Sequence, residues 1–217
     1  MKRARVVVTT SHRPTQRVRS FVKDLVSVLP EAERLTRGKA TFRDLYYEAV
    51  ARGAQRVIIV SVWKGNPGTL SVYEPLEPPE MELRLMTRMI LEGVRLSRET
   101  PGAQRAYGAR SLGIYVSPAA SEDLHHLADV LARSMLAGIA VDYEEALSRF
   151  DVVAVVNRGR SSLAEIEFRC STGRVCGPLL RLASVVDYDT GLRLYRAKGP
   201  LREASPSPSK GSGDRGT

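Results

Sequence analysis

The sequence lacks the features that mark a metalloprotein or a membrane protein. Its 217 residues include three histidines and two cysteines, and these side chains have none of the spacings that hold a metal ion. No apolar run approaches the ~20 residues that span a membrane, and the first apolar segment is too short for the core of a signal peptide. We therefore expect a cytoplasmic protein with no metal site and no membrane partner.

Motifs of catalysis and nucleotide binding are also missing. No Gly-x-Gly-x-x-Gly follows the first apolar segment, and there is no Walker lysine. Ser11 and His12 are adjacent in the sequence, which does not orient one against the other for nucleophilic attack. The sequence thus indicates binding without catalysis, with no cofactor and no enzymatic activity.

Acidic residues are scarce at the N-terminus. Seven Lys or Arg and no Asp or Glu occur between Met1 and Lys23, and the whole chain carries a formal charge of +9 with a pI near 9.9. Residues 1–110 hold 20 Lys or Arg against 11 Asp or Glu, whereas residues 111–198 hold 10 against 11. This balance predicts an acidic partner, most often nucleic acid, on the first half of the chain.

The basic residues are mainly arginine. Arginine outnumbers lysine 27 to 6, which suits bidentate contacts with phosphate. A GC-rich genome or a heat-adapted proteome gives the same bias, so the composition alone leaves both explanations open.

Residues 6–29 combine a strand, a polar loop and a basic helix. We expect a strand over residues 4–10 and a helix over residues 14–29 that begins at Pro14, whose missing N–H is not needed in the first turn. Unpaired N–H groups and the positive end of the helix dipole attract an anion at such a start. Apolar side chains share one helix face, and basic side chains lie on the other face or just before the helix: Arg13, Arg17, Arg19 and Lys23. These four are candidate phosphate contacts, although basic residues on a helix face are also common as solvated side chains.

Further basic residues occupy predicted loops. Gly38 stands among basic neighbours that include Arg34 and Arg43, in a loop whose backbone can approach a phosphate closely. A hairpin turn is expected at residues 64–68, and a tight turn surrounds Gly159. The candidate RNA contacts from these loops are Arg37, Lys39, Lys64, Arg158 and Arg160. Each alone is also compatible with a solvated turn residue.

Three aromatic residues could stack on bases: Tyr46, Tyr47 and Trp63. Tyr46 falls on the expected core face of a helix over residues 42–52. Trp63 ends the expected strand 56–63 and is compatible either with core packing or with stacking on a base.

The order of predicted elements indicates an α/β fold with two tandem pseudo-repeated halves, each a mixed sheet with helices. The first half contains helices 14–29 and 42–52, the latter with a capping box at Thr41 and Asp44, and strands 4–10, 34–36, 56–63 and 69–73. Residues 81–95 alternate like a strand at first and then show apolar spacings that also fit a helix; we expect a strand. In the second half, helices begin at Ser121 and Asp142, among strands 111–116, 152–156, 163–170 and 179–188. The halves, about 1–107 and 108–198, are expected to form a single domain, 1–198. Residues 199–217, rich in Ser, Pro and Gly, are predicted to be a disordered tail.

The two cysteines flank an expected hairpin turn. Cys170 and Cys176 are six positions apart and could face each other across neighbouring strands. Disulfides are unusual in the cytosol outside hyperthermophiles. We therefore expect two reduced thiols.

Three segments resemble the Brix-domain proteins, which act in ribosome biogenesis. The first is Thr-Thr-Ser-His-Arg-Pro-Thr-Gln-Arg at residues 9–17, continued by residues 30–38. The second is Lys-Gly-Asn-Pro-Gly-Thr-Leu at residues 64–70, and the third is Cys-Gly-Pro-Leu-Leu-Arg-Leu at residues 176–182, which is similar to the σ-like segment of the family. The resemblance extends over residues 4–196.

This resemblance implies a single Brix domain of the short archaeal type, whose halves are each similar to the anticodon-binding domain of a synthetase class. It also implies a non-enzymatic protein that binds ribosomal RNA (pre-rRNA) during processing and subunit assembly, with other ribosome-assembly proteins as further partners. The σ-like segment departs from the family pattern, because Leu179 and Leu180 stand where an Arg-aromatic pair is usual. Arg181 is the nearest replacement for that arginine.

The leading hypothesis is therefore an assembly factor whose basic N-terminal half grips the RNA backbone. A protein-interaction scaffold with a near-neutral second half is the first alternative. An enzyme with a phosphate pocket around Ser11 is the second, and it lacks an acid, base or metal site in the sequence.

Overall fold

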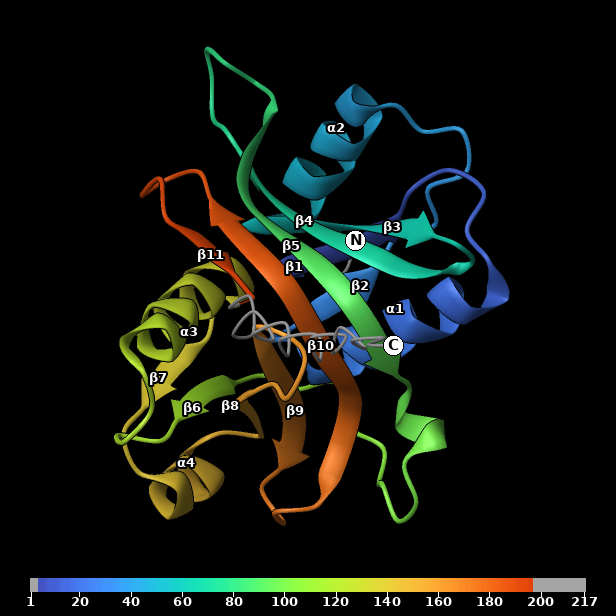
Figure 1. Cartoon of the computed structure of the whole chain (residues 1–217). Coiled ribbons are helices and arrows are strands. Elements are labelled where there is room, and N and C mark those ends of the chain that lie inside the picture. Colours follow the sequence, from blue (N-terminus) through green and yellow to red (C-terminus); the bar gives the residue numbers. More distant parts are fainter. Residues whose placement is uncertain (1–3, 197–217) are drawn as a thin grey trace, which may run out of the picture.

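The computed structural model describes residues 4–196 (Figure 1). The first part of the chain forms β1 (Val6–Thr10), α1 (Gln16–Val28), β2 (Ala32–Arg34), α2 (Phe42–Arg52), β3 (Arg56–Trp63), β4 (Asn66–Pro75) and β5 (Leu83–Arg95). After a 3-10 turn, Ser97–Glu99, follow β6 (Leu112–Val116), α3 (Glu122–Met135), β7 (Gly138–Ala140), α4 (Tyr143–Arg149), β8 (Val152–Arg158), β9 (Ala164–Cys170), β10 (Val175–Asp187) and β11 (Arg193–Tyr195).

The strands form one mixed sheet, which confirms the predicted α/β class. Its order is β2-β1-β3-β4-β5-β10-β9-β8-β6-β7, and β11 pairs with β10. The strand β1 is parallel to β2 and β3, and β6 is parallel to β7 and β8, whereas the other pairs are antiparallel. The long strands β5 and β10 lie side by side at the centre and join two series of five strands (Figure 1).

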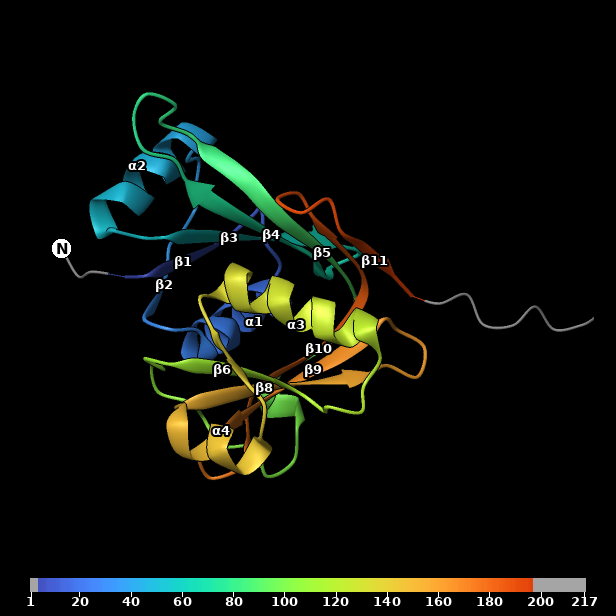
Figure 2. The same cartoon turned by 90° about the vertical axis from the view of Figure 1, so that its left-hand side faces the viewer.

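The helices α1 and α2 cover opposite faces of the first series of strands. Alternate residues of a strand point to opposite faces, and Val6 and Val8 belong to the cluster that contains the α1 side chains. Val7 instead packs with Leu45 and Ala49 of α2. Figure 2 shows α2 above and α1 below β1 and β3. The chain therefore passes to one face of the sheet after β1 and to the other face after β2.

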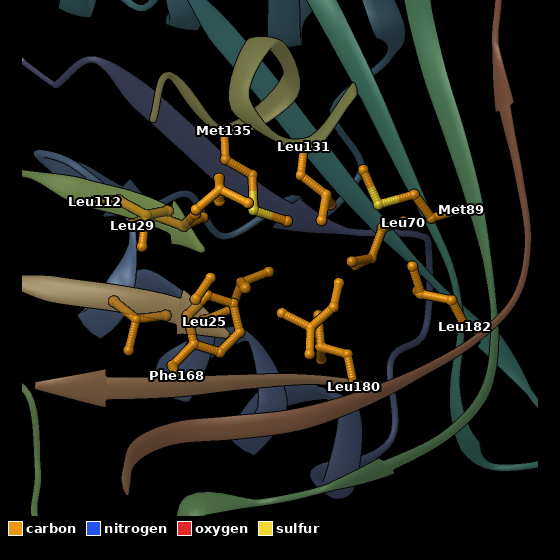
Figure 3. Close-up of a cluster of buried hydrophobic side chains, with 14 of the residues drawn as sticks. Leu25, Leu29, Leu70, Met89, Leu112, Leu131, Met135, Phe168, Leu180 and Leu182 are labelled. Atoms are coloured by element: carbon orange, nitrogen blue, oxygen red, sulfur yellow. The ribbon is translucent and has the colours of Figure 1, made fainter. Parts of the chain in front are cut away.

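The largest core cluster is shared by both series of strands. It gathers Leu25 of α1, Leu29 directly after that helix, Met135 of α3, Phe168 of β9 and Leu180 of β10, all of them buried (Figure 3). Burying such side chains stabilises a fold by about 1.5–3 kcal/mol each. One continuous apolar core thus holds α1 of the first series and α3 of the second.

Helix α1 begins two residues later than the sequence suggested. Thr15 is its N-cap, with its Oγ1 accepting from the N–H of Val18 at 3.3 Å, and Pro14 precedes the cap. An N-cap hydroxyl accepts a hydrogen bond from one of the free N–H groups of the first turn. A proline at the first position only removes one N–H that would have no partner. The capping box of α2 at Thr41 and Asp44 is confirmed, as is its termination at Gly53 with a φ of 70°.

Several strand boundaries and one turn also differ from expectation. The strand predicted at 179–188 begins four residues earlier, as β10 (Val175–Asp187), because Val175 pairs with Arg169 of β9. The strand expected at 34–36 lies at Ala32–Arg34. The hairpin between β3 and β4 has two turn residues, Lys64 and Gly65, with φ angles of 47° and 81°. Two positive φ values make a tight turn that matches strand twist, so residues 66–68 belong to β4 instead of the predicted turn. The strand predicted at 81–95 is confirmed as Leu83–Arg95, and the strands β7 and β11 were not predicted.

The prediction of two reduced thiols is wrong. A disulfide joins Cys170, at the end of β9, to Cys176 of β10, with 5.7 Å between their Cα atoms. The turn between them closes tightly, with Gly173 at a φ of 75° and the N–H of Cys170 donating to the carbonyl of Arg174 at 3.0 Å. This geometry lies within the Cα separation that a disulfide needs, and the expectation of thiols rested on compartment instead of geometry.

The predicted tail, residues 199–217, lies outside the described residues. Within residues 4–196, each helix is too short or too polar to cross a membrane.

Candidate nucleic-acid interface

The loops that follow β1 and β2 enclose a cavity, which we call the β1–β2 crevice. Because the two strands are parallel, their carboxyl ends meet at one edge of the sheet, and the chain leaves them toward α1 and α2 on opposite faces. Ligands of open α/β sheets bind in such crevices. The cavity has a volume of about 390 Å³ and is lined by Thr10, Ser11, Arg13, Pro14, Arg19, Arg34, Leu35, Thr36, Arg37 and Gly38.

Four arginines and no carboxylate line the β1–β2 crevice. Among residues 4–196, the side chains of Arg13, Arg19 and Arg34 form no ion pair. Uncompensated cations around a concave surface focus the electrostatic potential and raise the local concentration of anions. The crevice is therefore suited to phosphate groups.

The start of α1 adds to this positive potential. Its first turn contains no acidic residue, whereas the first turns of α2, α3 and α4 all contain one or two. Acidic side chains at that position stabilise a helix by opposing the positive end of its dipole. In α1 the same place carries Arg17, which pairs with Glu99, and Arg19, which has no carboxylate partner among the described residues. An external anion beside Arg19 would therefore oppose the positive end of the dipole.

Hydrogen bonds hold the loops around the crevice in place. The Nδ1 of His12 bonds to the carbonyl of Gly38 at 3.2 Å, which ties the loop after β1 to the loop after β2. The hydroxyl of Thr15 donates to the carbonyl of Gly65 at 2.7 Å, which ties the start of α1 to the β3–β4 hairpin. Arg13 has a φ of 55°, a conformation that costs a non-glycine residue about 1 kcal/mol or more and persists only where surrounding contacts impose it. The arrangement is thus set before a ligand binds.

Arg37 forms part of the crevice wall and supports its own loop. Its side chain is buried, with its Nε donating to the carbonyl of Ala40 at 3.2 Å and its guanidinium carbon 5.2 Å from the centre of the Phe42 ring. Burial lowers the pKa of the Arg37 guanidinium, against a smaller opposing effect from Tyr73, but an arginine stays charged in a protein. Arg37 therefore contributes fixed positive charge while holding residues 37–40 in shape.

Arg17, also predicted as a phosphate contact, is engaged within the protein. Its guanidinium pairs with both carboxylate oxygens of Glu99 and donates to the carbonyl of Val94 at 3.0 Å. The hydrogen bond from Arg17 lowers the pKa of Glu99, and the same bond raises the pKa of Arg17. Arg17 thus ties α1 to the turn that follows β5, instead of standing free on the basic face.

Three predicted contacts are lysines that lie outside the crevice lining, on elements that border it. Lys39 is exposed beside Gly38, and Lys64 is exposed in the hairpin that Thr15 contacts. Lys23 is exposed one helical turn beyond Arg19 on α1.

Arg158 and Arg160 are not part of this group. They are exposed at the end of β8 and in the connection to β9, in the other series of strands beyond the β5–β10 pair.

Arg34 lines the crevice as the last residue of β2, although it is not among the RNA contacts predicted from the sequence. The signal that could have found it is its position at the carboxyl end of a strand parallel to β1.

Residues 4–196 contain no cluster of three or more His, Cys, Asp or Glu side chains that could hold a metal ion. General acid-base chemistry in the crevice would also need a group other than a carboxylate, since none lines it.

Comparison with protein-family models gave no match. Individual proteins are nevertheless similar in sequence. A probable Brix domain-containing ribosomal biogenesis protein of Aeropyrum pernix is 36% identical over 187 residues, which cover 81% of this chain and 93% of that protein. A protein of the same description from Pyrococcus horikoshii is 33% identical over 167 residues, covering 77% of this chain and 67% of that one.

Two solved structures share the fold. The crystal structure of a probable ribosomal biogenesis protein from Aeropyrum pernix aligns with a TM-score of 0.69 and 33% identity, over 82% of this chain and 95% of that one. An archaeal Imp4-like protein aligns with a TM-score of 0.60 over 83% of this chain and 99% of that one, at 17% identity, and this second likeness concerns the fold alone. Because the Brix domain-containing protein of Aeropyrum pernix is 36% identical and aligned over 93% of its own length, the chain belongs to the Brix-domain family.

Proposed function

We propose that this protein is a non-catalytic ribosome-assembly factor that binds the backbone of ribosomal RNA in the β1–β2 crevice. The observation that carries the proposal is the group of four arginines, with no carboxylate among them, at the carboxyl ends of two parallel strands. The relatives described as ribosomal biogenesis proteins make ribosomal RNA the polyanion of choice. Pre-rRNA processing, the cytoplasmic location and partnership with other assembly proteins follow from the same proposal.

The physical basis is charge neutralisation at phosphates. A guanidinium can form two parallel hydrogen bonds with one phosphate, and each neutralised phosphate releases counterions. Contacts of this kind position the protein on RNA without selecting a base. We assign the contacts to Arg13, Arg19 and Arg34, with Lys39 and Lys64 at the margins, and leave Arg17 to its structural pairing with Glu99.

The strand order supports a further part of the proposal, the relation between the two halves. The order β2-β1-β3-β4-β5 recurs as β7-β6-β8-β9-β10 on the other side of the sheet. We infer that the halves are pseudo-repeats, each with the architecture expected of an anticodon-binding domain. We place RNA binding in the first half only, because the net charge of the second half is close to zero.

The test compares two sets of three charge removals. One variant carries Arg13→Ala, Arg19→Ala and Arg34→Ala. The control carries Arg88→Ala, Arg174→Ala and Arg193→Ala, which remove three exposed arginines from β5, the β9–β10 turn and β11. Both change the net charge equally.

We expect the crevice variant to lose affinity roughly 100-fold for a fluorescently labelled fragment of ribosomal RNA at low salt, at about 1 kcal/mol for each of three solvent-screened contacts. The control should lose much less, since only the long-range charge is reduced. Equal losses in two folded variants would show that net charge alone binds the RNA and that the crevice is not the site.

A protein-interaction scaffold is the second candidate, favoured by an exposed apolar surface on α2. A groove of about 510 Å³ is lined by Phe42, Arg43, Tyr46, Tyr47, Glu80, Met81, Glu82 and Leu83. Its aromatic and acidic lining differs from that of the β1–β2 crevice. Capture of the same protein partners from nuclease-treated and untreated lysate would favour this role, whereas loss of those partners after nuclease treatment would favour RNA.

A further inference from the structure

The only tryptophan of the chain is exposed at the end of β3. Trp63 has 67% of its surface accessible to solvent, although tryptophan is on average a highly buried residue. Its position answers the question that the sequence left open, because the ring is not part of the core. A large, rigid aromatic surface at a strand end is available to a ligand.

The local backbone is shaped to hold Trp63 in this position. Asn66 pairs with Trp63, and Gly68 lies at an irregularity in the pairing of β3 with β4. A Cβ at Gly68 would come within 2.4 Å of the Trp63 Cβ and 3.1 Å of its backbone N. Only a glycine fits there, because such separations require atoms to shift. The Nζ of Lys64 lies over the indole ring at 5.8 Å from its centre, so a cation accompanies the aromatic surface.

Trp63 projects from the same edge of the sheet as the β1–β2 crevice. The strand β3 is parallel to β1, with Val60 paired to Thr10, and continues three residues further to Trp63. At 3.3 Å per residue, Trp63 lies about 10 Å beyond that pair along the strand. The next turn is bonded to Thr15, whose neighbour Pro14 lines the crevice. A strand of RNA with phosphates in the crevice therefore has bases within reach of this ring.

We propose that Trp63 stacks on an unpaired base of the RNA whose phosphates occupy the crevice, with Lys64 contacting an adjacent phosphate. This inference rests on the proposed function and specifies its substrate class as RNA with at least one unstacked nucleotide. Bases within an A-form duplex are stacked on each other and their faces are closed to an aromatic side chain, whereas bases of loops, bulges and ends can be splayed onto one. The ring thus selects single-stranded or looped segments without reading their sequence.

The test uses Trp63→Ala and Trp63→Phe with two RNA probes of equal phosphate number: a single-stranded pyrimidine oligonucleotide and a fully paired duplex. Stacking on an aromatic residue contributes about 1–3 kcal/mol per base. We expect Trp63→Ala to weaken single-stranded binding by roughly 5- to 150-fold and duplex binding by less than about twofold. Trp63→Phe should retain most of the single-stranded affinity, because it keeps a π-face.

Intrinsic fluorescence supplies a second readout, since Trp63 is the sole tryptophan. Its emission should be quenched at saturation by the single-stranded probe and remain nearly unchanged with the duplex. The matched control is Tyr107→Ala. Tyr107 is 86% exposed, and its segment lies near the amino end of β2, where the N–H of Glu31 donates to the carbonyl of Ala109 at 2.8 Å. That variant should bind both probes as the unmodified protein does.

The outcomes separate this inference from the proposed function. Unchanged single-stranded affinity in a folded Trp63→Ala variant, or equal losses for both probes, would overturn the stacking role while the loss of affinity in the crevice variant still supports RNA binding. If the unmodified protein binds neither probe, both the proposed function and the stacking role fail. Protein capture by Trp63 that survives nuclease treatment, with no effect on RNA, would assign the ring to a protein partner and also overturn the inference.

Discussion

Replacing Gly177 by alanine should destabilise the protein sharply, because this glycine lies where the end of α1 packs on β9 and β10. Gly177 lies in β10, and a Cβ built there would come within 2.6 Å of the Phe168 Cβ and 2.7 Å of the Val28 Cγ1. Both neighbours are fully buried, Phe168 in β9 and Val28 at the end of α1. The Phe168 Cβ is fixed to the backbone and cannot rotate away, so relief requires α1 or the sheet to move.

Overpacking of this kind costs about 1–3 kcal/mol, and we expect the upper half of that range here. With a urea m-value of about 2–3 kcal/mol/M, the midpoint of urea unfolding should fall by roughly 0.7–1.5 M. The assay is urea unfolding followed by far-UV circular dichroism, with the midpoint and the m-value both fitted. A single transition is expected, since one apolar core joins the two series.

Gly93→Ala is the matched control. Gly93 lies in β5, pairs with Arg181 of β10, and has no neighbouring atom within 4 Å of a built Cβ. This substitution should leave stability unchanged or raise it by up to about 1 kcal/mol, because it restricts only the unfolded chain. Equal midpoints for Gly177→Ala, Gly93→Ala and the unmodified protein would refute the close packing of α1 on β9 and β10.

Two further predictions concern the Arg17–Glu99 pair and the disulfide. The pKa of Glu99 is lowered in the folded protein, mainly by the hydrogen bond from Arg17, so its contribution is present above the unfolded pKa of about 4.3 and is lost as pH falls through the lower folded value. Glu99→Gln should therefore lower the free energy of unfolding by up to about 1 kcal/mol at pH 7, since both side chains are about a third exposed, and by less at pH 3. An equal loss of stability at both pH values, measured by urea unfolding, would contradict this. Removing the bridge with Cys170→Ser and Cys176→Ser should cost about 2 kcal/mol for so short a loop, and titration of the unreduced, unfolded protein should find no free thiol, two reactive thiols being the contrary result.

Much of the fold was predictable because its long elements carry local patterns. The capping box at Thr41 and the continuous apolar run of β3 indicated the type of those elements from neighbouring residues alone. The strands β2, β7 and β11 have three residues each, too few for a period to show. Their existence depends on pairing with β1, β6 and β10, so they were misplaced or missed.

The candidate site was predictable only in part. Periodicity correctly put Arg19 and Lys23 on the solvent face of α1, but it could not show that Arg17 on the same helix pairs with Glu99, 82 residues away. Arg34 enters the crevice only because β2 is parallel to β1. The exposure of Trp63 likewise depends on the length of β3 relative to its neighbours. In each case a contact distant in sequence decides the role of the residue.

The salt dependence of RNA binding decides whether the crevice grips an RNA backbone. For single-stranded RNA the slope of log K against log salt is about −0.7 for each neutralised phosphate. Arg13, Arg19 and Arg34, together with Lys39 and Lys64, would give a slope of roughly −2 to −3.5 and a loss of affinity of about 15- to 130-fold between 50 and 200 mM salt. The variant with Arg13, Arg19 and Arg34 replaced by alanine should show a slope shallower by about 2. An affinity that stays constant over this range, or a slope that the three substitutions leave unchanged, would contradict phosphate binding in the β1–β2 crevice.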